Sequence, residues 1–175
     1  GRFFYEMTEL SKLRIPVIAK VDGIATAAGC QLVATCDLAI ASDDSTFATP
    51  GVNIGLFCST PSVALSRVTP RKKSLEMLLT GDNITAEAAV RFGLINSRVE
   101  KDKLDDEVEK LANIIAKKPK RIIEIGKKTF YEQLEKPISQ SYEYTSEVMT
   151  KNMLEADCIE GISAFIEKRK PKWSL

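Results

Sequence analysis

The stretch Ala27-Ala28-Gly29-Cys30-Gln31 places small residues at the expected start of a helix and then sets an amide side chain within an apolar run. We expect this helix to begin at Thr26, which can cap it, so that its first backbone N–H groups lack intrahelical partners. These groups lie at the positive end of the helix dipole, and the small residues allow a ligand oxygen to approach the N–H of Ala28 closely. Gln31 comes three residues later and therefore lies on the same helical face as Ala28.

The same stretch is also compatible with a purely structural role. Small residues permit tight packing of a helix on a sheet, and Gln31 can satisfy a nearby carbonyl. The residue types alone leave both interpretations open.

A second group of polar residues, Cys58, Ser59 and Thr60, follows Gly55-Leu56-Phe57 and precedes a helix that we expect near Pro61. Hydroxyl and thiol groups become effective nucleophiles when a base activates them, and no base is evident nearby. We therefore expect these residues to cap the helix and pack beneath it.

The chain contains no histidine. This excludes a Ser-His-Asp triad, a Cys-His dyad and a His-ligated metal within the chain, and we expect no metal site. The four cysteines, Cys30, Cys36, Cys58 and Cys158, have no CxxC spacing and lie among apolar neighbours. That pattern is typical of reduced, buried thiols with structural roles in an intracellular protein.

Length and composition indicate a globular protein with a substantial core, since 44% of the 175 residues are hydrophobic. With 25 basic and 24 acidic residues the net charge is +1, which gives no overall attraction to nucleic acid or to a membrane surface. No apolar run reaches the roughly 18 residues that span a bilayer. The first residues lack the features of a secretory signal and lie within an amphipathic helical pattern, so we expect the natural protein to have a further amino-terminal portion.

Hydrophobic periodicity predicts short alternating elements in the first part of the chain and long amphipathic helices afterwards. Expected strands cover residues 15–21, 38–41, 46–49 and 94–99, and expected helices cover 26–35, 62–68, 71–79 and 85–92. Further helices are expected over residues 104–115, 122–134, 139–154 and 157–168. The last of these ends in Lys168-Arg169-Lys170-Pro171-Lys172-Trp173, whose cations can stabilise a helix end or meet an anionic ligand.

Three segments, taken in order, resemble the crotonase superfamily, the enoyl-CoA hydratases and isomerases. They are "PVIAKVDGIATAAGCQLVATCDLAIASDDSTFATPGVNIGL", "LTGDNITAEAAVRFGLINSRV" and "EGISAFIEKRKPKW". The resemblance implies an α/β fold: a spiral of strand-strand-helix units, here truncated, followed by carboxyl-terminal oligomerisation helices. We accordingly expect a partial spiral core with an acyl-CoA site over residues 1–100 and a helical oligomerisation region over residues 101–175.

The resemblance also assigns roles to individual residues. One N–H that polarises the thioester carbonyl would come from Ala28, and the other from an earlier segment that this chain does not contain. The two carboxylates of the hydratases correspond to Gln31 and Gly51, and the carboxylate of some isomerase and dehalogenase relatives corresponds to Ser59. Phe165 and Lys168 correspond to residues that approach coenzyme A bound to a neighbouring subunit.

None of the three acid positions carries an acid, and hydration of an enoyl thioester needs one group to deprotonate water and another to protonate the α-carbon. We therefore expect an acyl-CoA-binding protein of mitochondrial fatty acid or lipid metabolism that is not a competent hydratase. Two alternatives stay open: an active lyase or isomerase that uses other groups, and a regulatory or structural acyl-CoA binder without turnover.

Further expectations concern partners and variants. The resemblance implies a homotrimer or hexamer. It also implies a mitochondrial location, which rests on the resemblance alone because we find no targeting segment in this chain. It implies no cofactor beyond the coenzyme A of the ligand, and no nucleic acid or membrane as a partner. We expect Gln31→Glu together with Gly51→Glu to restore some hydration if the longer side chain fits at residue 51.

Overall fold

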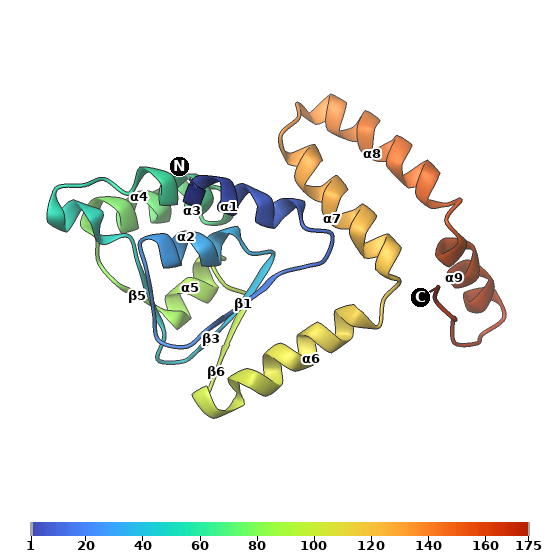
Figure 1. Ribbon diagram of the computed structural model, residues 1–175, viewed down its shortest axis with the longest axis horizontal. Helices are drawn as coiled ribbons and strands as arrows, with labels where there is room; N and C mark the ends of the chain where they lie inside the picture. Colours follow the sequence, from blue (N-terminus) through green and yellow to red (C-terminus); the bar gives the residue numbers. More distant parts are fainter. Residues whose placement is uncertain (1, 175) are drawn as a thin grey trace. The chain divides into compact units, whose positions relative to one another are not determined.

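The computed structural model describes residues 2–174, with side chains from Met7 onward. The chain forms two compact units: the first joins the start of the chain, up to Leu10, with Val17–Ala112, and the second joins Ser11–Pro16 with the residues from Asn113 onward (Figure 1). No helix among the described residues is long and apolar enough to cross a membrane.

Two small sheets form the frame of the first unit. Strands β1 (Ile18–Val21), β3 (Leu38–Ser42) and β6 (Ser97–Val99) form a parallel sheet in the order β1-β3-β6. In the second sheet, β4 (Thr46–Ala48) pairs in parallel with β2 (Ile24–Thr26) and antiparallel with β5 (Ile84–Thr85). The four strands expected from the sequence are present: β1, β4 and β6 are shorter than expected, and β3 is one residue longer. Strands β2 and β5 were not expected.

The order of the elements repeats a strand-strand-helix unit. Strands β1 and β2 lead into helix α2 (Ala28–Thr35), and β3 and β4 lead through a 3₁₀ turn (Pro50–Ile54) into α3 (Ser59–Val68). The first strand of each unit joins one sheet and the second strand joins the other. This arrangement confirms the expected α/β spiral.

The other helices follow the expected sequence pattern closely. They are α1 (Arg2–Lys12), α4 (Arg71–Thr80), α5 (Ala86–Phe92), α6 (Leu104–Ala116), α7 (Lys120–Leu134), α8 (Ile138–Asn152) and α9 (Ala156–Ile166), with a 3₁₀ turn at Lys101–Lys103. Thr85 caps α5 by accepting a 3.2 Å hydrogen bond from the N–H of Ala88. Gly81 and Gly93 end α4 and α5 in the left-handed conformation that favours glycine.

The start of α2 differs from the expectation that Thr26 caps the helix. Thr26 is the last residue of β2, where it pairs with Ala48 of β4. Ala27 is the N-cap residue, with no side-chain cap, and the helix begins at Ala28. The prediction was wrong because pairing with a strand distant in the sequence keeps Thr26 extended.

The core of the first unit lies between the sheets and the helices α2, α3, α4 and α5. Phe47 and Leu65 are fully buried, and small residues such as Ala41 and Ala89 let the elements approach closely. Cys30 and Cys58 are buried in this core, as expected, whereas Cys36 and Cys158 are only half-buried. None of the four, all of which lie in the described part of the chain, forms a disulfide.

The second unit is built around a hairpin of two long helices, α7 and α8, which lie side by side in Figure 1. The hydroxyl of Ser141, at the start of α8, donates a 2.8 Å hydrogen bond to the carbonyl of Gln133, near the end of α7. This unit leaves many large apolar side chains half or more exposed, including Ile138, Tyr142, Leu154, Phe165 and Ile166.

The carboxyl-terminal tail folds back onto α9. Arg169 donates to both carboxylate oxygens of Glu160, at 2.6 and 3.0 Å, and the N–H of Lys172 donates to the same carboxylate at 2.7 Å. The ring of Trp173 packs against Gly161, since a Cβ added there would lie 3.3 Å from it. The hydrogen bond from Arg169, followed by that from Lys172, lowers the pKa of Glu160 from 4.5 to about 2.

We therefore predict that the tail is released from α9 in acid. A carboxylate whose pKa is lowered by its contacts contributes stability above its ordinary pKa and loses that contribution as the pH falls from 4.5 toward 2. Trp173 is the single tryptophan, so its emission reports the release. We expect its spectrum to shift toward that of exposed indole across this range, while far-UV circular dichroism follows the helices separately.

Glu160→Gln is the matched control, because it keeps the size of the side chain and removes its charge. This variant should show the emission of the released tail already at about pH 7 and change little on acidification. A wild-type spectrum that stays constant as the pH is lowered to about 2 contradicts the prediction.

Candidate functional site

The start of α2 offers a backbone N–H group for binding. Ala27 has φ 48° and ψ −112°, an uncommon conformation for a residue with a side chain, and its N–H donates a 2.9 Å hydrogen bond to the carbonyl of Ala48. No side chain caps the first turn that begins at Ala28. A Cβ added at Gly29 would meet nothing within 4 Å, so there is open space beside this turn. The arrangement can stabilise negative charge on a bound oxygen.

Gln31 lies three residues after Ala28 and therefore on the same face of α2. The residue is only 5% exposed, and its Oε1 has no hydrogen-bond partner among the described residues. A buried acceptor without a partner costs about 1–3 kcal/mol, so this amide is available to a ligand.

Thr49 is a second buried polar residue with an unused group. It is fully buried, and its Oγ1 likewise has no partner in the described part of the chain. The hydrogen bond from Ala27 to Ala48 brings Thr49 to the start of α2. Thr49 was not expected in the site from the sequence, although its position after a short strand, two residues before Gly51, was a usable signal.

Gly51 is enclosed by the loop that follows it. An ideal Cβ at this residue would overlap the carbonyl oxygen of Leu56 and would lie 2.8 Å from Sγ of Cys58. The loop is held in this position by a 2.9 Å hydrogen bond from the N–H of Leu56 to the carbonyl of Gly51. The expectation that Gly51→Glu could complete an acid pair required that the longer side chain fit, and this backbone does not meet that condition, because a Cβ at residue 51 would overlap the main chain of Leu56.

The thiols and hydroxyls near the site differ in exposure. Cys58, rather than Ser59 or Thr60, is the N-cap residue of α3, and its side chain makes no cap hydrogen bond. Ser59 and Thr60 lie in the first turn of α3 and are exposed. Burial raises the pKa of the Cys30 thiol to about 12, against the opposing effect of a hydrogen bond from the Ala48 backbone.

Of the residues expected to form the site, Ala28, Gln31, Gly51 and Ser59 belong to the first unit. Phe165 and Lys168 belong to the second unit. Phe165 is 85% exposed at the end of α9, and Lys168 follows the helix with φ 54°. Arg169, next to Lys168, forms ion pairs with Glu160 and Glu167.

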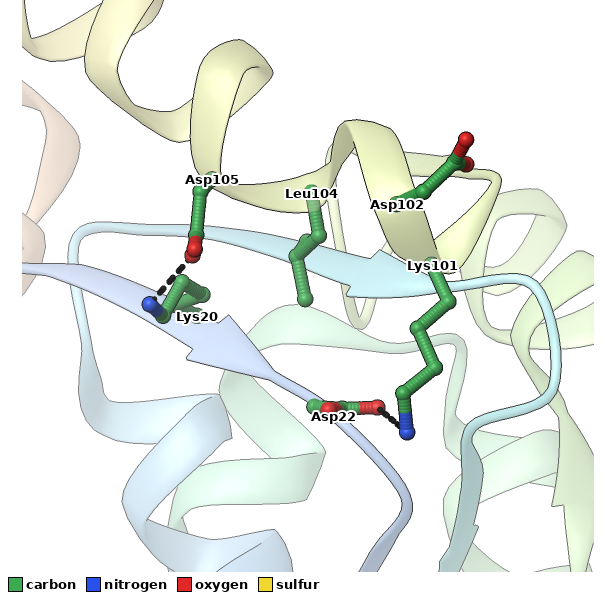
Figure 2. A pocket seen from close by; sticks show the side chains of 6 residues that line it. All are labelled: Lys20, Asp22, Lys101, Asp102, Leu104 and Asp105. Atoms are coloured by element: carbon green, nitrogen blue, oxygen red, sulfur yellow. Dashed lines mark hydrogen bonds and ion pairs between the residues drawn. The ribbon is translucent and has the colours of Figure 1, made fainter.

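A separate, highly charged hollow lies at the end of β1 (Figure 2). Its cations and carboxylates pair with one another: Lys20 lies 2.5 Å from Asp105, and Lys101 lies 3.0 Å from Asp22. These partners raise the pKa of both lysines. The mutual pairing of these charges makes the hollow a poor place for an apolar acyl group.

Comparison with known proteins relates the chain to one family of enzymes. Residues 2–175 match the model of a family described as enoyl-CoA hydratase/isomerase. The chain is 53% identical to enoyl-CoA hydratase domain-containing protein 3, mitochondrial, of Rattus norvegicus over 160 residues, which are 91% of this chain and 53% of that protein. The human protein of the same name is 52% identical over the same length, again 91% of this chain and 53% of its own. The chain thus spans about half the length of these curated relatives.

Solved structures agree with this relation. The crystal structure of human enoyl coenzyme A hydratase domain-containing protein 3 superposes with a TM-score of 0.95 at 50% identity, covering 98% of this chain and 68% of that one. An enoyl-CoA hydratase of Mycobacterium smegmatis superposes with a TM-score of 0.94 at 47% identity, covering 99% of this chain and 71% of that one.

The close approach of the loop to Gly51 predicts that Gly51→Ala destabilises the protein. The added Cβ must displace the Leu56 carbonyl, a main-chain group, and overpacking of this kind typically costs about 1–3 kcal/mol. Urea denaturation should show a lower midpoint with an unchanged slope.

Gly29→Ala is the matched control, because its Cβ meets nothing within 4 Å and lies in a helix. This variant should be as stable as the wild type, or more stable by about 0.5–1 kcal/mol. Equal stability of Gly51→Ala and the wild type means that the loop does not enclose residue 51 in solution.

Proposed function

The chain belongs to the enoyl-CoA hydratase/isomerase family, and from this premise we propose that it binds an acyl-CoA thioester without hydrating it. The thioester oxygen accepts a hydrogen bond from the N–H of Ala28. The acyl chain extends past Gln31 toward Gly51 and the loop that encloses it.

The observation that carries this proposal is the pair formed by an open helix start and a buried, unpartnered amide at Gln31. An amide has nearly the size of a carboxylate and can orient a water molecule or a ligand atom. The amide cannot take up a proton at neutral pH. The helix start can therefore polarise the thioester carbonyl, but Gln31 cannot carry out the proton transfer that hydration needs.

The second acid position supports the same conclusion. Gly51 has no side chain, and the carbonyl of Leu56 fills the space that a side chain needs. Each general acid or base typically contributes ~10²–10⁴-fold in rate, so the absence of both removes nearly all of the hydratase reaction. The alternative is a reaction that passes through a thioester enolate and uses a base carried by the substrate itself. The open helix start favours this alternative, because the N–H of Ala28 can stabilise the enolate oxygen.

The second unit extends the proposal to coenzyme A and to self-association. Phe165 and Lys168 are exposed at the end of α9, where an apolar ring and a cation suit a nucleotide and its phosphates. We propose that they contact coenzyme A bound to a neighbouring copy. Large apolar side chains are exposed on each of α7, α8 and α9, and contiguous exposed apolar surface marks interaction sites, which supports a homotrimer or hexamer. Because the curated relatives are named as mitochondrial proteins, we propose the same compartment and a role in acyl-CoA metabolism.

We predict that the protein binds crotonyl-CoA saturably but forms 3-hydroxybutyryl-CoA no faster than the uncatalysed reaction. Calorimetry measures binding, and mass spectrometry of the quenched mixture identifies the product. Gln31→Glu should restore little hydration, because residue 51 still supplies no second acid.

Binding without product separates the proposed function from that of an active hydratase. Efficient hydration by the wild type, or absence of any binding of crotonyl-CoA, contradicts the proposal.

The proposed role of Lys168 predicts that Lys168→Glu weakens binding of butyryl-CoA about tenfold or more, because it reverses a charge beside phosphate. Raising the salt concentration should weaken the wild type in the same direction. Lys117→Glu, at an exposed lysine between α6 and α7, makes the same change of charge outside α9 and its tail and should leave the affinity unchanged. Equal affinities of the two variants would assign Lys168 to the solvated surface.

A further inference from the structure

The thiol of Cys58 lies at the position from which a second acid would extend. An ideal Cβ at Gly51 would be 2.8 Å from Sγ of Cys58, so the thiol lies beside the space that a side chain at residue 51 would occupy. Cys58 directly precedes α3, which packs against α2, the helix whose start carries the N–H of Ala28. Cys58 is 8% exposed, so the residue is buried but still partly accessible to solvent.

The other three thiols are less suited to react with a ligand at this site. Cys30 is fully buried, and its pKa of about 12 keeps it protonated. Cys36 follows the last residue of α2, and the eight residues of that helix separate it by about 12 Å from the turn of Ala28. Cys158 belongs to the second unit.

An independent observation indicates that a polar ligand enters this region. Gln31 and Thr49 are both more than nine-tenths buried, and each has a side-chain oxygen without a partner among the described residues. Gln31 lies three residues after Ala28 on the same helical face, and Thr49 directly follows Ala48, whose carbonyl accepts the hydrogen bond from Ala27. Buried polar groups are nearly always hydrogen-bonded, so these two are expected to contact a ligand or its water.

We propose that Cys58 is a covalent acceptor for α,β-unsaturated acyl thioesters: its sulfur adds to the β-carbon of a thioester whose carbonyl is bound at Ala28. This inference rests on the proposed function, because the thioester must first bind at the start of α2. In this proposal each protein molecule reacts once with one thioester and does not hydrate it.

The step is a conjugate addition that needs no oxidant and no further reactant. The sulfur–carbon bond forms at the β-carbon, and the π electrons of the double bond move onto the thioester as an enolate, whose oxygen the N–H of Ala28 stabilises. A proton equivalent to the one lost from the thiol is then taken up from water at the α-carbon. The product is a thioether between Cys58 and a saturated acyl-CoA, with the thioester bond intact.

The test is intact-mass spectrometry of the chain after incubation with crotonyl-CoA, followed by peptide mapping. We expect a gain of one whole crotonyl-CoA, with Cys58 labelled about tenfold or more faster than Cys36 and Cys158 because the bound thioester is held beside it. Butyryl-CoA, which has no double bond, should bind and leave the mass unchanged. Cys58→Ser should abolish the adduct, and Cys36→Ser should retain it.

Two outcomes overturn the inference in different ways. If butyryl-CoA binds by calorimetry and crotonyl-CoA at saturating concentration leaves Cys58 unlabelled, the covalent step is wrong and the proposed function stands. If neither thioester binds, the proposed function fails, and the inference fails with it. Labelling spread equally over the accessible thiols also overturns it. Should Cys58→Ser fail to fold, the peptide map of the wild-type protein decides the question alone.

Discussion

The hydrogen bond from the N–H of Ala27 to the carbonyl of Ala48 is the interaction on which the site depends. It fastens the start of α2 to the end of β4, and it holds Ala27 at a positive φ that costs on the order of 1–3 kcal/mol for a residue with a side chain. Because of this bond, the start of α2, which carries Ala28 and Gln31, lies next to the end of β4, which Thr49 follows. Strand β2 also pairs with β4, and this pairing aligns Thr26 with Ala48. The pairing and the hydrogen bond together hold Ala27 in its strained conformation.

This geometry separates two functions that an enzyme of the family needs together. Polarisation of a thioester carbonyl depends on main-chain N–H groups, which survive any substitution except one to proline. Proton transfer depends on side chains, and the positions that the resemblance assigns to them carry an amide at Gln31 and a hydrogen atom at Gly51. The carbonyl of Leu56 fills the space beside Gly51 that an acidic side chain would need. The backbone, as well as the residue type, therefore excludes an acid at residue 51. Under the proposed function, such a site would recognise a thioester without performing the acid-base chemistry.

The sequence predicted most of what local rules decide. The helix expected over residues 85–92 was found within one residue, with Thr85 as its N-cap, because a threonine before a helix satisfies free N–H groups within the same short segment. The cap at Thr26 was wrong, because its conformation is decided by Ala48, a partner 22 positions away in the chain. The roles of Ala28 and Gln31 could be proposed from residue types and resemblance. The enclosure of Gly51 by Leu56 could not, because a loop path that returns onto an earlier residue leaves no periodic signal in the sequence.

The most direct test of the account is the infrared absorption of the thioester carbonyl in butyryl-CoA labelled with ¹³C at that carbon and bound to the protein. A preorganised N–H at a helix start polarises the carbonyl more strongly than water does, so the account predicts a labelled C=O band at lower frequency in the complex than in solution. A bound ligand whose carbonyl band is unchanged from that in water would contradict the account, because the thioester would then bind without contacting the start of α2.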